Sequence, residues 1–104
     1  MAPDFEAVIA DTKRYADVVR SQLPVDKVYL YGSYAKRTAD TLSDVDVAVF
    51  LRHYGGKERI EVGIHLLRIA RDFDIYIEPL AFETSDLYAN NPFVDEILRS
   101  GLEL

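Results

Sequence analysis

The chain has 104 residues, which suffices for one small domain and is too short for two independent cores. Hydrophobic residues make up 49% and charged residues 29%, which excludes disorder as the main state. The formal net charge is −6, so the chain lacks the excess of basic residues expected of proteins that bind DNA or RNA broadly. No apolar run approaches the roughly 20 residues of a membrane-spanning helix. Without cysteines or a signal-peptide core at the N-terminus, the sequence predicts a cytoplasmic protein.

Hydrophobic periodicity predicts a single domain over residues 1–104, with elements in the order α-β-β-α-β-α. The expected class is α/β or α+β, with helices packed on a three-stranded mixed sheet. The predicted elements are a helix over 5–23, strands over 25–31 and 45–51, a helix over 57–71, a strand over 73–80, a helical turn over 85–89 and a helix from Pro92 to before Gly101.

The strand over 45–51 is the most apolar part of the chain, so we expect it to be central and covered on both faces. The strand over 73–80 alternates instead. Its apolar residues point to one side, and Asp74, Tyr76 and Glu78 point to the other. This alternation indicates a strand that is buried on one face only.

Two acids stand at the entrance of the second strand. Asp44 and Asp46 are two residues apart, so their carboxylates share a face at roughly 6.5–7 Å separation. Like charges this close favour a bound cation, and oxygen ligands without nearby His or Cys favour Mg²⁺, with Mn²⁺ as the alternative. Asp74 would complete a cluster for two metal ions if the second and third strands are neighbours. Asp72 competes with Asp74 for this place because the two share a face.

A glycine and a serine leave the first strand. Gly32 permits a sharp turn and a close backbone approach, and Ser33 adds a hydroxyl. If Tyr34 to Arg37 opens a short helix, its free N–H groups form an anion site, which Lys36 and Arg37 could extend towards a triphosphate. A polar loop over 38–43 follows. Phosphate contacts beside a magnesium site favour a metal-bound nucleotide as substrate.

The pattern Gly32-Ser33, ten residues, then Asp44-x-Asp46 resembles the signature of the minimal nucleotidyltransferases of the DNA polymerase β superfamily, which include MntA-type antitoxins. The resemblance extends over nearly the whole chain, including the ending from Asn91 to Gly101. It implies a palm-like core, with Asp44, Asp46 and Asp74 as catalytic metal ligands and with Gly32 and Ser33 at the triphosphate, and Lys36 follows in the same turn as a further candidate for nucleotide binding.

The resemblance also implies a reaction and a partner. Members of the family transfer AMP from ATP to a hydroxyl, and some inactivate a helical HEPN-type ribonuclease toxin by modifying its tyrosine. Little chain follows the third strand, so we expect a partner or a second subunit to bring the acceptor. The alternatives are a non-catalytic antitoxin that acts by occlusion and a stand-alone adenylyltransferase of small molecules.

One departure from the family pattern concerns the residues after the Gly-Ser turn. The family usually has Arg-Gly where this chain has Lys36-Arg37. Lysine lacks the bidentate fork of arginine, and Arg37 has less backbone freedom than glycine. We therefore expect the metal site to be intact, and nucleotide affinity and turnover to be the properties that these two residues affect.

Overall fold

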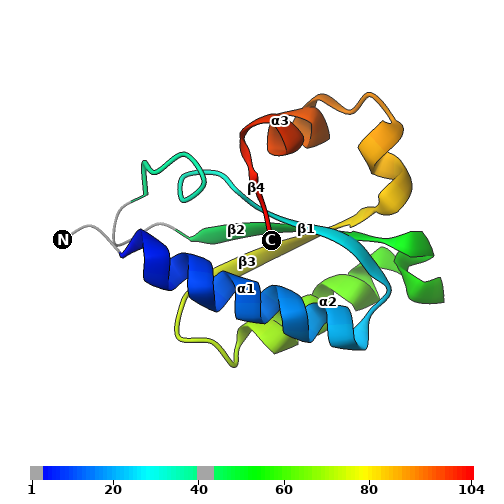
Figure 1. Cartoon of the computed structure of the whole chain (residues 1–104). Coiled ribbons are helices and arrows are strands. Elements are labelled where there is room, and N and C mark those ends of the chain that lie inside the picture. Colours follow the sequence, from blue (N-terminus) through cyan, green and yellow to red (C-terminus); the bar gives the residue numbers. More distant parts are fainter. Residues whose placement is uncertain (1–3, 40–43) are drawn as a thin grey trace.

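The computed structural model describes residues 4–39 and 44–104, and Figure 1 shows their arrangement. Residues 40–43 of the predicted loop lie outside the described residues. The elements in chain order are α1 (Phe5–Gln22), β1 (Val25–Tyr31), β2 (Val45–Leu51), the 3₁₀ helix η1 (Arg52–Gly56), α2 (Arg59–Ala70), β3 (Ile77–Glu83), the 3₁₀ helix η2 (Thr84–Tyr88), α3 (Pro92–Ser100) and β4 (Leu102–Glu103).

Over residues 4–39 and 44–104, the sheet is mixed and contains four strands in the order β3-β2-β1-β4, so the prediction of three strands is wrong. Strand β1 pairs antiparallel with β2 and with β4, and β2 pairs parallel with β3. The additional strand, β4, has two residues, which lie opposite Tyr29 and Leu30. A two-residue strand is too short for any hydrophobic alternation to appear in the sequence.

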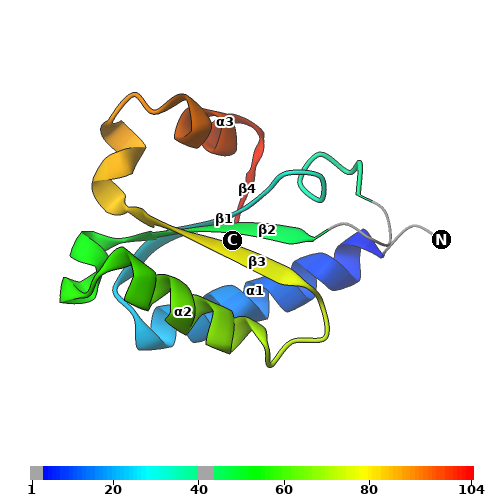
Figure 2. The same ribbon diagram turned by 180° about the vertical axis from the view of Figure 1, so that it is seen from behind.

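Helices cover both faces of the sheet, with α1 and α2 on one face and α3 on the other (Figures 1 and 2). The alternation of β2 explains this. Val45, Val47 and Val49 belong to the core beneath α1 and α2, whereas Ala48 and Phe50 belong to the core beneath α3. The prediction of a central second strand covered on both faces is confirmed.

Helix ends are fixed by side chains that accept backbone hydrogen bonds. Asp4 accepts from Glu6 and Ala7 at the start of α1, and Asn91 caps α3, in which Pro92 is the first residue. Buried Tyr15 of α1 donates from its hydroxyl to the carbonyl of Leu66 at 2.9 Å, which ties α1 to α2. In the described part of the chain, no helix is both long and apolar enough to cross a membrane.

The third strand begins four residues later than the alternation predicts, at Ile77 instead of Phe73. The register sets this limit, because Ile77 lies opposite Val45, the first residue of β2. Phe73 is partly buried without belonging to the strand: its ring packs edge-on against Tyr15 at 5.7 Å between centroids. The apolar residue Phe73 before Ile77 is therefore explained by packing against α1 and not by pairing with a neighbouring strand.

Candidate active site

Gly32 and Asp46 meet at one end of the sheet. Gly32 directly follows β1, and Tyr31, the last residue of β1, lies opposite Asp46 of β2. Gly32 has φ +74°, and a Cβ atom there would lie 2.4 Å from the Asp46 Oδ2 atom. Only glycine leaves room for this carboxylate, so the predicted turn and the predicted acid form one structural unit.

A third carboxylate joins this end of the sheet from β3. Glu78 lies in register with Asp46 and shares a hydrogen bond with Asp44. That hydrogen bond, then burial and the charges of both aspartates, raises the pKa of Glu78. Burial, followed by the charge of Asp44, raises the pKa of Asp46. Both shifts mean that these acids disfavour one another's ionised forms in the absence of a cation.

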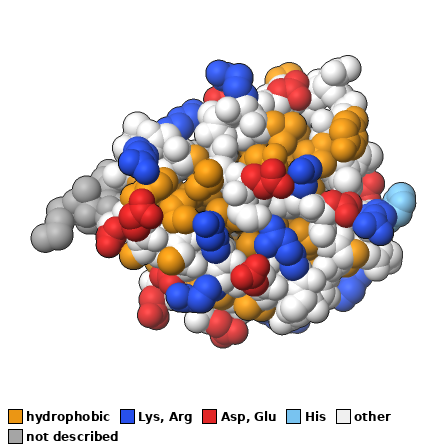
Figure 3. All heavy atoms as spheres, viewed as in Figure 1, with side chains coloured by type: hydrophobic (Ala, Val, Ile, Leu, Met, Phe, Trp, Pro, Cys, Tyr) orange, Lys and Arg blue, Asp and Glu red, His pale blue; other side chains and the backbone are white. Residues whose placement is uncertain are grey.

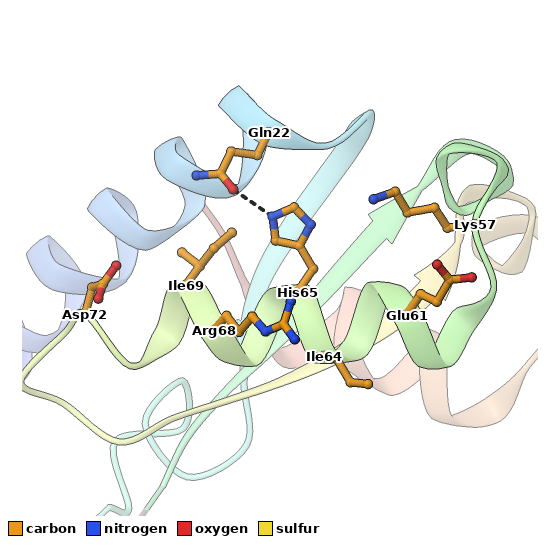
Figure 4. Close-up of a pocket in the computed structure, with 8 residues that line it drawn as sticks. All are labelled: Gln22, Lys57, Glu61, Ile64, His65, Arg68, Ile69 and Asp72. Carbon is orange, nitrogen blue, oxygen red and sulfur yellow. Dashed lines mark hydrogen bonds between the residues drawn. The ribbon is translucent and has the colours of Figure 1, made fainter.

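The structure does not bring the two predicted third acids to this cluster. Asp74 precedes β3 and is exposed, beside a hollow that Leu67 and Ile77 help to line. Asp72 lies at the groove between α1 and α2 (Figure 4). The placement of Asp74 on the third strand was wrong because the strand starts at Ile77. The alternation in the sequence could have indicated Glu78 as the third acid, because Glu78 and Asp74 lie on the same polar side of the predicted strand.

The chain after Gly32 forms consecutive turns and not the short helix that the sequence suggested. The amide of Lys36 donates to the carbonyl of Gly32 at 3.1 Å, and that of Thr38 donates to the carbonyl of Ser33 at 2.8 Å. Ser33 is partly exposed at the start of this turn. The turn therefore holds the Gly-Ser pair next to Asp46 through backbone hydrogen bonds.

The two basic residues of the turn have contacts within the protein. The Lys36 Nζ atom lies 3.6 Å from a carboxylate oxygen of Glu96 in α3. The Arg37 guanidinium lies 4.1 Å from the centre of the Phe5 ring. Arg37 also has φ +58°, in the left-handed region that favours glycine. The backbone at Arg37 is thus strained, and a cation–π contact offsets part of the cost.

We expect Arg37→Gly to be more stable than Arg37→Ala by about 1 kcal/mol. Both variants lose the contact with Phe5, so their difference isolates the cost of the positive φ. Thermal unfolding measures it, since 1 kcal/mol corresponds to about 4–8 °C in a domain of this size. Equal melting temperatures would show that the left-handed conformation carries no strain.

Aromatic side chains lie on the α3 side of the acidic cluster. The sequence did not indicate these aromatic neighbours. Tyr31 packs edge-on against Phe93 of α3 at 5.9 Å between centroids. Burial, and then the charges of Asp46 and Glu78, raises the pKa of Tyr31 to about 12. Its phenol therefore stays neutral beside the carboxylates at physiological pH.

The carboxylates are chemically suited to bind a divalent cation. Hard oxygen donors from Asp44, Asp46 and Glu78 are the ligands that Mg²⁺ and Mn²⁺ take. Within residues 4–39 and 44–104, no three Asp, Glu, His or Cys side chains lie close enough together to hold a metal ion. Mg²⁺ itself needs few protein ligands, because it keeps several waters and takes further oxygens from substrate phosphates.

A Gly-Ser turn against an acidic cluster at the end of a mixed sheet is the arrangement expected of a nucleotidyltransferase. Residues 13–104 match the family described as "Polymerase beta, Nucleotidyltransferase". The chain is also 31% identical, over 81 residues, to a candidate protein adenylyltransferase of Methanocaldococcus jannaschii, a match that covers 77% of this chain and 79% of the relative. The chain therefore belongs to the polymerase β nucleotidyltransferase family, and the protein is a nucleotidyltransferase.

Solved structures share the fold. A candidate nucleotidyltransferase from Sulfolobus solfataricus superimposes with a TM-score of 0.68 over 95% of this chain and 80% of its own, at 14% identity. A mutant form of the toxin–antitoxin complex MntA–HpeT contains a chain that matches with a TM-score of 0.56 at 19% identity, over 89% of this chain and 70% of its own. At these identities the likeness establishes the α+β fold alone.

Proposed function

We propose that the protein uses Mg²⁺ to transfer AMP from ATP to a tyrosine hydroxyl of a HEPN-type toxin and so acts as its antitoxin. The observation that carries the proposal is the approach of the Gly32 backbone to the Asp46 carboxylate. It puts a turn suited to phosphate next to acids suited to metal. The relative named as a candidate protein adenylyltransferase supports a protein acceptor, and the fold shared with a toxin–antitoxin chain supports the partner.

In this proposal the residues of the site have different roles. Gly32 and Ser33 bind the triphosphate, and Lys36 contributes charge when it leaves Glu96. Asp44, Asp46 and Glu78 hold the metal, which when bound offsets negative charge on the phosphates. The acceptor oxygen attacks the α-phosphorus, the bond to the β-phosphate oxygen breaks, pyrophosphate leaves, and the hydroxyl proton passes to a carboxylate or to solvent.

We favour Glu78 over Asp74 as the third carboxylate, since Glu78 lies in register with Asp46. We expect Glu78→Gln to lower nucleotidyl transfer by at least about 100-fold and Asp74→Asn to change it less than about threefold. Steady-state transfer rates at saturating Mg²⁺ measure both. A large loss in Asp74→Asn with full activity in Glu78→Gln would return the role to Asp74.

A stability measurement separates this loss from misfolding. The pKa of Glu78 is raised in the folded protein, so its contribution to stability is present at low pH and is lost as the pH rises through that pKa. At neutral pH without divalent cations, Glu78→Gln removes a repulsive charge. We therefore expect this variant to unfold at the same temperature as the wild type or a higher one.

ATP radiolabelled on either the α- or the γ-phosphate tests the reaction class. The protein is incubated with its co-expressed toxin, Mg²⁺ and each labelled ATP in turn. The proposal expects label on the toxin from the α-phosphate only, and loss of that label when the acceptor tyrosine is changed to phenylalanine. Label from the γ-phosphate would instead indicate phosphoryl transfer and contradict the proposal.

The same assay distinguishes the two alternatives. Inhibition of the toxin with no labelled product would indicate an antitoxin that acts by occlusion, and the pairing of Lys36 with Glu96 is the observation that favours this alternative. Label on small molecules of a cell extract, with none on protein, would indicate a small-molecule adenylyltransferase. Either result would contradict transfer to a toxin.

A further inference from the structure

Helix α2 carries an apolar stripe on the side away from the sheet. Ile60, Ile64 and Leu67 are 75%, 45% and 47% exposed. Their spacing of four and three residues puts them in one line along the helix. The opposite side of α2 is buried against the sheet through Val62, Leu66 and Ile69. An isolated exposed leucine needs no explanation, but an aligned apolar row indicates a contact surface.

The close-up in Figure 4 shows the orientation of this stripe relative to α1. His65 points to α1, where its Nε2 atom lies 2.7 Å from Gln22 Oε1, and Ile64 points away from α1. Contact with α1 therefore leaves the stripe uncovered. Acidic and basic side chains are interspersed over the face of the molecule that Figure 3 shows, which is the face with α1 in front.

The stripe is complementary to itself when two copies of α2 run antiparallel. If Ile64 of one copy lies across Leu67 of the other, the symmetry repeats this contact on the other side of the centre. The same register puts Ile60 of each copy across Arg71 of the other. There Leu67, Ala70 and Phe73 help to line a hollow of about 380 Å³ that can receive the isoleucine.

Charges and side-chain sizes agree with this register. Glu61 and Arg68 flank the stripe on the α1 side and are seven residues apart, about 10.5 Å along the helix, too far to pair within one chain. In the antiparallel pair, Glu61 of each copy lies beside Arg68 of the other. On the far side of the stripe is Gly63, and a Cβ at Gly63 would meet no atom within 4 Å in the single chain. A small residue there lets the helices approach closely.

We infer that the protein forms a symmetric dimer through antiparallel packing of α2 against α2 of a second copy. Asp46 alternates with the valines beneath α1 and α2, so it lies on the α3 side of β2, and the contact leaves the acidic cluster open to substrate. A contact dominated by one helix pair is small, so we expect a dissociation constant on the order of 10–100 µM.

Sedimentation equilibrium over this concentration range tests the inference. The wild type should dimerise, and Ile64→Glu, which buries a charge at the centre, should weaken the dimer at least about tenfold. Tyr88→Ser is the control, because Tyr88 is a large exposed hydrophobic residue outside α2, 79% exposed against 45% for Ile64, and this variant should dimerise like the wild type. A monomeric wild type, or unchanged dimerisation of Ile64→Glu, would overturn the inference.

Charge reversal tests the register itself. Glu61→Arg and Arg68→Glu should each weaken self-association, because each puts like charges beside one another in the pair. A mixture of the two variants should restore dimers, since every arginine then lies beside a glutamate. Dimers that tolerate both single changes, or a mixture that stays monomeric, would contradict the antiparallel register. Thermal unfolding confirms that each variant is folded, and none of these measurements depends on catalysis.

Discussion

Asp46→Asn should lower nucleotidyl transfer by about a thousandfold or more while leaving the protein folded. Asn keeps the shape of the side chain that fits against Gly32, but it removes the charge that would hold Mg²⁺. Initial rates of AMP transfer at saturating ATP and Mg²⁺ measure the loss. If the variant retained more than about a tenth of the activity, Asp46 would not be a metal ligand.

Binding of the metal provides a second measurement on the same variant. In the wild type, Mg²⁺ should raise the melting temperature, because it binds the folded protein and offsets the repulsion between the carboxylates, which adds to burial in raising the pKa of Asp46 and to the Asp44 hydrogen bond and burial in raising that of Glu78. Asp46→Asn should melt at the wild-type temperature or above it without Mg²⁺, and should respond weakly when Mg²⁺ is added. An equal response in both proteins would place the ion elsewhere.

Gly32→Ala adds one methyl group, and we expect it to reduce stability and activity more than any other added methyl group in the turn. The added Cβ would lie 2.4 Å from Asp46 Oδ2, and alanine also disfavours φ +74°. We expect a loss of at least about 2 kcal/mol in the free energy of unfolding, together with loss of transfer because the carboxylate is displaced. Chemical denaturation and the labelling assay measure the two effects.

Gly56→Ala is the control for this substitution. Gly56 has φ +78°, nearly the same conformation, but a Cβ there would meet no atom within 4 Å. It should therefore cost only the conformational strain of about 1–2 kcal/mol and leave transfer unchanged. If both variants lost stability equally and kept full activity, the contact between Gly32 and Asp46 would have no role in the site.

The sequence predicted the parts of the site that local patterns define. Gly32 follows a β-branched and aromatic run, and Asp46 opens the most apolar run, so both were expected at strand ends, where the structure has them. Their mutual contact was not predictable, because it depends on the register of Tyr31 opposite Asp46. Pairing register is a long-range property that one strand's alternation does not determine.

The third strand illustrates the limit more sharply. Phe73 and Ile75 alternate with polar residues as a half-buried strand would, yet they precede the strand and pack against the core. The start of β3 is set by where Val45 begins its partner strand, which is information from another part of the chain. Because the start of the strand moves by four residues, an even number, the polar residues stay on the same face of the strand. Glu78 therefore takes the position next to Asp46, and local alternation alone does not distinguish it from Asp74.

A structure with Mg²⁺ and a non-hydrolysable ATP analogue would test the assignment of the site without relying on activity. We expect the triphosphate to lie against Gly32 and Ser33, with the ion bound by Asp44, Asp46 and Glu78. A nucleotide bound at another part of the molecule, or an ion held by Asp74 without Glu78, would contradict this assignment.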